Sequence, residues 1–170
     1  MDCNSDSNNA RNKQPLKRNQ VDQLNFQLNT QPDCVHILRA MVEVMAARSN
    51  LTDMETNRVA LAVDELFANI TCHGYNNKPG SVTFESHLQH NEDGLQELHF
   101  TFRDYAPTVN ISHWNCGKSK PCHDLDITPG GLGIRLIHSI MDVVQHEALH
   151  DGNQWTLIYV CKHAIKRGRP

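Results

Sequence analysis

The sequence predicts an α+β domain in which one mixed, mostly antiparallel sheet carries helices on one face. Several short segments alternate apolar and polar residues, which is typical of strands, and most of them follow one another across short turns. The helical patterns between them are too few for the crossovers of a doubly wound parallel sheet. With 170 residues, the chain is the size of one such domain.

The first strand and the first helix come early in the chain. Residues 21–28 alternate loosely as a strand, and Pro32 and Asp33 then open a helix that we expect to end near Asn50. The apolar residues of this helix recur at helical spacing: Val35, Leu38, Val42, Met45 and Ala46.

A second helix has the clearest boundaries. Thr52 and Glu55 match a capping box, in which each side chain bonds the backbone N–H of the other residue. Gly74 stands where a helix C-terminus is expected. Between these ends the apolar residues form one stripe: Val59, Ala62, Val63, Leu66, Phe67 and Ile70.

The second half of the chain predicts a hairpin, a loop, a helix and two more strands. Residues 82–88 and 95–105 alternate around the turn sequence 91–94, so we expect an antiparallel pair. Residues 106–129 lack periodicity and form a candidate lid. The glycine-rich stretch 130–133 opens a third helix that runs through Met141. Strands over 143–149 and 155–161 follow, joined by a turn at 151–153.

Both ends of the chain differ in composition from the part between them. Residues 1–20 are nearly all polar and predict a disordered tail, and residues 164–170 predict a basic tail, so the folded domain spans 21–163. A net charge of −3 and 6% aromatic residues argue against direct nucleic-acid binding, and no apolar run is long enough for a membrane span. Six scattered cysteines without an apolar leader predict reduced thiols and a cytoplasmic protein.

One side of the second helix carries two polar residues suited to metal chemistry. Glu65 and Asn69 are four residues apart and lie on the shoulder of the apolar stripe, about 90 to 130 degrees from its centre. A carboxylate and an amide oxygen there suit Mg²⁺, which keeps water and phosphate as its other ligands. The pair alone is more typical of the ordinary polar face of a helix.

Two further features have open alternatives of their own. The glycines of 130–133 precede a helix, where backbone N–H groups can hold a phosphate, although glycine there is also common in simple turns. Asp104 follows a strand, where it either accepts a hydrogen bond from an exocyclic amine or caps a turn.

Taken together, these stretches resemble the GHKL ATPase superfamily in order and spacing. Residues 64–75, with the sequence DELFANITCHGY, resemble its N box. Residues 102–107, FRDYAP, look like its G1 box, and residues 129–137, PGGLGIRLI, look like its G2 box. Within the superfamily, the His-Gly-Tyr ending, the short length and the closing segment 151–157 are similar to bacterial anti-sigma factors that are also serine-protein kinases.

The resemblance covers residues 21–162 and implies a two-layer Bergerat-type sandwich that binds ATP and Mg²⁺ between the N-box helix and the lid. It implies that Glu65 is the general base and that Asn69 is the Mg²⁺ ligand. The nucleotide-binding residues that it implies are Asp104 for the adenine amino group, Ala106 at the third G1 position, Gly131 and Gly133 for the phosphates, and the Thr156 hydroxyl for adenine.

The activity that the resemblance implies is transfer of the γ-phosphoryl group of ATP to a serine or threonine of an anti-sigma factor antagonist. The partners would be that antagonist and a sigma factor, with a homodimer formed through the sheet side away from the lid. The alternative is a non-catalytic regulatory module that sequesters a sigma factor or another regulator without phosphoryl transfer. A fragment of a sensor histidine kinase fits less well, because no phosphoacceptor helix precedes residue 21.

Two departures from the pattern bear on these alternatives. Ala106 stands where the G1 box normally has glycine, and a positive φ there would cost of order 1 kcal/mol and weaken nucleotide binding. The candidate lid contains His113, Cys116, Cys122 and His123, whose spacing matches no common zinc framework. The identity of the partners and the oligomeric state are not encoded in any motif.

Overall fold

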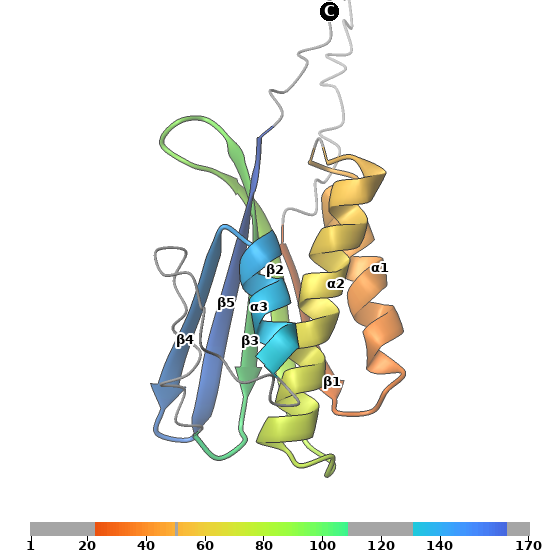
Figure 1. Ribbon diagram of the computed structural model, residues 1–170, viewed down its shortest axis with the longest axis vertical. Coiled ribbons are helices and arrows are strands. Elements are labelled where there is room, and N and C mark those ends of the chain that lie inside the picture. Colours follow the sequence, from red (N-terminus) through yellow and green to blue (C-terminus); the bar gives the residue numbers. More distant parts are fainter. Residues whose placement is uncertain (1–22, 50, 109–130, 163–170) are drawn as a thin grey trace, which may run out of the picture.

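The computed structural model describes residues 23–49, 51–108 and 131–162. Within them the chain forms five strands and three α-helices, with one short π-helix after the second α-helix (Figure 1). Along the chain the elements are β1 (Gln23–Asn29), α1 (Cys34–Ala46), α2 (Asp53–Asn69), η1 (Ile70–Gly74), β2 (Ser81–His90), β3 (Gln96–Asp104), α3 (Gly131–Ile140), β4 (Val143–Leu149) and β5 (Gly152–Cys161).

The strands form one sheet in the order β1-β2-β3-β5-β4. Every pairing among the described strands is antiparallel, so the predicted mostly antiparallel sheet is confirmed. The predicted hairpin joins β2 and β3, and Gly94 takes a φ of +76° in its turn. The helix α3 follows β3 in the chain and leads to the edge strand β4. In the sheet, β5 lies between β3 and β4.

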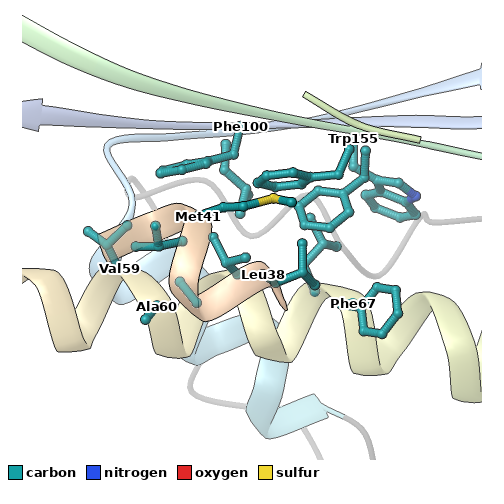
Figure 2. Close-up of a cluster of buried hydrophobic side chains, with 14 of the residues drawn as sticks. Leu38, Met41, Val59, Ala60, Phe67, Phe100 and Trp155 are labelled. Atoms are coloured by element: carbon teal, nitrogen blue, oxygen red, sulfur yellow. The ribbon is translucent and has the colours of Figure 1, made fainter. Parts of the chain in front are cut away.

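All three helices cover the same face of the sheet (Figure 1), as predicted. Alternate residues of the central strands point into this layer and are fully buried, among them Phe84 on β2 and Phe100 and Phe102 on β3. They meet buried side chains of α1 and α2, as Figure 2 shows for Leu38, Met41 and Val59 near Phe100. Burial of this apolar area, at roughly 25 cal/mol per Å², is the main force that holds the two layers together.

The second helix begins as the sequence indicates. The backbone N–H of Glu55 donates to the Thr52 hydroxyl at 3.3 Å, and the Thr52 N–H donates to the Glu55 carboxylate at 2.9 Å, which confirms the capping box. Its end differs from a simple α-helix: residues 70–74 form a π-helix, closed by the Tyr75 N–H on the Ile70 carbonyl at 3.1 Å. The first helix ends at Ala46, a few residues before the predicted Asn50, with a turn over the next residues.

Several predictions fall outside the described residues. These are the two tails, 1–20 and 164–170, and most of the candidate lid with its cysteines and histidines. Within the described ranges, no helix is both long enough and apolar enough to cross a bilayer. The cysteines among these residues, Cys34, Cys72 and Cys161, are free thiols.

Candidate functional site

The structure brings Glu65 and Asn69 of α2 against the first turn of α3. A methyl group at Gly133 would lie 2.6 Å from Glu65 Oε2 and 3.3 Å from Asn69 Nδ2. A side chain at this position would therefore displace the end of the Glu65 side chain. The two polar residues and the glycine come from separate predicted motifs, and the packing of α2 against α3 places them at one point.

The first turn of α3 offers backbone donors at this point. Gly131 is the first residue of the helix and Gly133 the third, so their N–H groups have no acceptor within the helix. These groups and the helix dipole attract an anion. A phosphate bound there would be next to the Glu65 carboxylate, and a cation between the two would offset their repulsion.

The Asn69 side chain is buried, with 8% of its surface exposed, yet its Nδ2 has no hydrogen-bond partner among the described residues. A buried NH₂ group without an acceptor is costly, so Nδ2 calls for a partner such as a phosphate oxygen, whereas only the Oδ1 of the same amide could bind a metal. Beside it lies the carboxylate of Glu65, which is half-buried. Oxygen donors of these two types fit Mg²⁺, which binds few protein ligands and keeps water and phosphate oxygens.

The neighbouring Asp64 serves packing instead. Its Oδ2 accepts from Arg39 Nε at 2.6 Å, which ties α2 to α1. Burial raises the pKa of the Asp64 carboxyl, although the Arg39 guanidinium works in the opposite direction. Adjacent acidic residues on α2 thus have different environments, one against α1 and the other against α3.

Asp104 ends β3 as a buried carboxylate with three donors around it. Its Oδ1 accepts from Ala106 N at 3.0 Å and from Asn153 Nδ2 at 2.9 Å, and its Oδ2 accepts from Trp155 Nε1 at 2.9 Å. Only 2% of the residue is exposed. The turn-capping interpretation of Asp104 is correct for the Ala106 bond, and the carboxylate also faces the helix layer.

Thr156, in contrast to the prediction, does not lie beside the Asp104 carboxylate and its donors. On β5, Trp155 and Leu157 are buried toward the helices, and the residue between them points to the opposite face of the sheet. There Thr156 pairs with Thr101 and Gln145. The residues of β5 that do reach Asp104 are Asn153, its register partner, and Trp155.

Tyr75 joins the end of the α2 segment to the Asp104 region. Its hydroxyl donates to the Ser81 carbonyl at 2.6 Å and accepts from the Tyr105 N–H at 2.8 Å. A side chain at Gly80 would overlap the Tyr75 ring, so the glycine makes room for it. Burial raises the pKa of the Tyr75 phenol. Tyr75 thereby links the segment that follows α2 to the segment that follows Asp104.

Ala106 is accommodated without backbone strain. Among the described residues, the non-glycine residues with positive φ are Asn76 and Asn77, so Ala106 does not adopt the conformation that would penalise its methyl group. The methyl is buried beside Gly74, where a Cβ would lie 3.1 Å from it. The expected cost of the missing glycine therefore does not arise.

Sequence reasoning gave no role to Asn153, Trp155 and Tyr75. The alternation of buried residues along β5 is the signal that would have pointed to Asn153 and Trp155 in place of Thr156. For Tyr75 no local signal exists, because its partners Ser81 and Tyr105 are 6 and 30 residues away.

Comparison with known proteins identifies the family of the chain. The family model for the histidine kinase-like ATPase domain matches residues 28–159. An anti-sigma F factor of Geobacillus thermodenitrificans (strain NG80-2) is 26% identical over 147 residues, which are 85% of this chain and 94% of the relative. The serine-protein kinase RsbW of Bacillus subtilis (strain 168) is 28% identical over 132 residues, 75% of this chain and 79% of the relative. Since the family model covers most of the chain, including α2, β3 and α3, this protein belongs to the family of histidine kinase-like ATPase domains.

Proposed function

We propose that this chain is an ATP-dependent protein kinase that phosphorylates a serine or threonine of an antagonist protein and that it sequesters a sigma factor when the antagonist is phosphorylated. The observation that carries the proposal is the contact of Glu65 and Asn69 with Gly133 at the start of α3. The relatives named anti-sigma F factor and serine-protein kinase RsbW support the same class of activity.

In the proposed reaction, the first turn of α3 holds the phosphates through the N–H groups of Gly131 and Gly133. Glu65 accepts the proton of the substrate hydroxyl while the hydroxyl oxygen bonds to the γ-phosphorus and the bond to the leaving ADP oxygen breaks. Asn69 and the phosphates would hold Mg²⁺, which neutralises the charge on the transferring group. Phosphoryl transfer depends mostly on positioning and charge stabilisation, so these few groups suffice.

At the other end of the site, Asp104 would accept a hydrogen bond from the adenine amino group. Its ring of protein donors leaves room for such a bond on Oδ2, which accepts from Trp155 alone among the described residues. Thr156, which the resemblance implied for adenine, points away, and we propose Asn153 in its place. A homodimer through the helix-free face of the sheet remains a prediction.

The test is phosphoryl transfer to an antagonist captured from the native host. Mass spectrometry after incubation with Mg-ATP should show the gain of one phosphate, and Glu65→Gln should abolish it. Glu43→Gln, an exposed substitution on α1, is the matched control and should leave transfer intact. Undiminished transfer in Glu65→Gln would exclude this residue as the base.

The alternative function is a binding module without transfer. This alternative depends on backbone strain at Ala106 that would weaken nucleotide binding. Ala106 is not among the described non-glycine residues with positive φ, so its backbone does not support the alternative. Calorimetric titration with ATP, with and without Mg²⁺, separates the two functions. Absence of ATP binding together with capture of a regulator from the host would establish the binding module.

A further inference from the structure

Four side chains at one end of the sheet contact one another in a closed ring, at the place proposed for the adenine base. They are Asp104, Asn153, Trp155 and His146. Asp104 bonds Asn153 and Trp155, and both of these contact His146 on the edge strand β4. The strand register places the residues opposite one another, Asp104 with Asn153 and His146 with Trp155. Nothing in the resemblance or the comparisons gives His146 a role.

The Asp104 carboxylate has nearly all its acceptor positions filled. A carboxylate has about four lone-pair positions. Within the described residues, Oδ1 receives two donors, from Ala106 N and Asn153 Nδ2, and Oδ2 receives one, from Trp155 Nε1. One acceptor position on Oδ2 is left for a ligand.

The direction of the Asn153 amide decides whether this arrangement holds. Its Nδ2 donates to Asp104 Oδ1 at 2.9 Å and to the Ala106 carbonyl at 3.4 Å. If the amide turned over, its oxygen would face the carboxylate oxygen, which is repulsive, and its NH₂ group would face away.

His146 completes this arrangement on the other side of the amide. Because Nδ2 faces Asp104 and the Ala106 carbonyl, Oδ1 faces the His146 ring, whose Nε2 lies 3.0 Å away and is the donor when it carries the ring proton. The same ring packs on Trp155 with the centroids 4.0 Å apart, next to the indole that donates to Asp104. His146 therefore contacts both side chains that hold the carboxylate.

We infer that His146 is a positioning residue for nucleobase discrimination: by donating to Asn153 it holds the amide against Asp104, so that the carboxylate keeps the place from which it admits a base with an amino group and rejects one with a carbonyl oxygen at the same position. The inference rests on the proposed binding of a nucleotide at Asp104. Without His146 the buried oxygen of the Asn153 amide loses its donor, so the amide and with it the Asp104 carboxylate are held less firmly, and the discrimination weakens.

The probes are ATP and inosine triphosphate, which carries a carbonyl oxygen where ATP carries the amino group. For the full chain we expect the Kd for inosine triphosphate to exceed that for ATP by roughly tenfold or more. In His146→Phe, which keeps a ring on Trp155, this ratio should fall by roughly fivefold. His146→Gln restores a donor to Asn153 and should recover much of the ratio of the two Kd values. If only the packing on Trp155 mattered, this variant would not recover it.

Two controls make the result decisive. His150→Phe, at an exposed histidine beyond the end of β4, should keep the wild-type ratio. Asn153→Leu removes the amide from the other side of the contact and should reproduce the effect of His146→Phe, so the test remains available if one variant does not fold. Circular dichroism establishes folding for each variant.

The outcomes separate the inference from the proposed function. An unchanged ratio in folded His146→Phe or Asn153→Leu, together with weaker ATP binding in Asp104→Asn, overturns the role of His146 and leaves the kinase proposal standing. Unchanged ATP binding in Asp104→Asn overturns the base site itself, and the inference with it.

Discussion

The methyl group of Ala106 lies in the space that Gly74 leaves beside it: a Cβ at Gly74 would lie 3.1 Å from the Ala106 Cβ. Such a distance is tighter than normal van der Waals contact, so only one of the two positions carries a methyl without strain. This contact joins the end of the N-box segment, which carries Glu65 and Asn69, to the segment that follows β3 and Asp104.

The first prediction concerns the coupling of these residues. Gly74→Ala should lower the free energy of unfolding in the wild-type background. In the Ala106→Gly background, the same substitution should cost about 1 kcal/mol less. Urea denaturation of the two single variants and the double variant measures this coupling. As a control, the effects of Gly74→Ala and of Ala47→Gly, at an exposed and distant residue, on the free energy of unfolding should be additive. Additive effects of Gly74→Ala and Ala106→Gly would refute the contact.

The second prediction separates activity from stability at Gly133. A methyl there would lie 2.6 Å from Glu65 Oε2, and the end of a flexible side chain moves aside more readily than backbone. Alanine also favours the helix by up to about 1 kcal/mol over glycine. We therefore expect Gly133→Ala to retain its free energy of unfolding while phosphoryl transfer falls roughly tenfold or more, because Glu65 is displaced. Ser139→Ala in the same helix should affect neither quantity.

The third prediction contrasts two glycines with positive φ. At Gly152, with φ of +146°, a Cβ would overlap the backbone carbonyl of Asp104, whereas at Gly94, with φ of +76°, no atom is within 4 Å. Gly94→Ala should cost about 1 kcal/mol from backbone conformation alone. Gly152→Ala should cost roughly 3 kcal/mol or more, because the overlap moves the chain at Asp104. Similar costs for the two variants in urea denaturation would contradict the close approach at Gly152.

The fourth prediction concerns stability at alkaline pH. Burial, followed by the hydrogen bond to Glu55, raises the pKa of Tyr159 from 10.0 to about 12. The folded state thus favours the neutral phenol, so its contribution to stability is complete below pH 10 and is lost as the pH rises from 10 to 12. The contribution is of order 2 kcal/mol.

The measurement is the free energy of unfolding at several pH values between 8 and 12, with reductant present. Tyr159→Phe should show a shallower decline across this window than the wild type. Tyr105→Phe, at a residue that is 52% exposed, should follow the wild-type curve. A parallel decline in Tyr159→Phe would show that other groups account for the alkaline loss.

The order of the elements and the start of α2 followed from short-range patterns. The Thr52–Glu55 box and the stripe of α2 are set by residues three and four apart, and the turn before Gly94 by four adjacent residues. Because each of these signals is local, the residues themselves encode them. The placement of Glu65 and Asn69 on a half-buried shoulder of α2 is of the same kind.

The composition of the site at Asp104 was decided by packing between distant segments. Its side-chain donors, Asn153 and Trp155, are 49 and 51 residues away in the chain, and His146 reaches it only through them. The expected Thr156 and the observed Asn153 differ by an odd number of positions, which on a strand means opposite faces of the sheet.

The sequence by itself determined the α+β class, the order of helices and strands, the start of α2 and the presence of a carboxylate–amide pair and a glycine-rich helix start, because local backbone and side-chain chemistry sets each of these. Only the tertiary structure decided that α3 packs its Gly133 against Glu65, that Gly74 leaves room for Ala106, and that Asn153 and Trp155 surround Asp104. These contacts depend on strand register and on the approach of helices, which the whole core fixes at once.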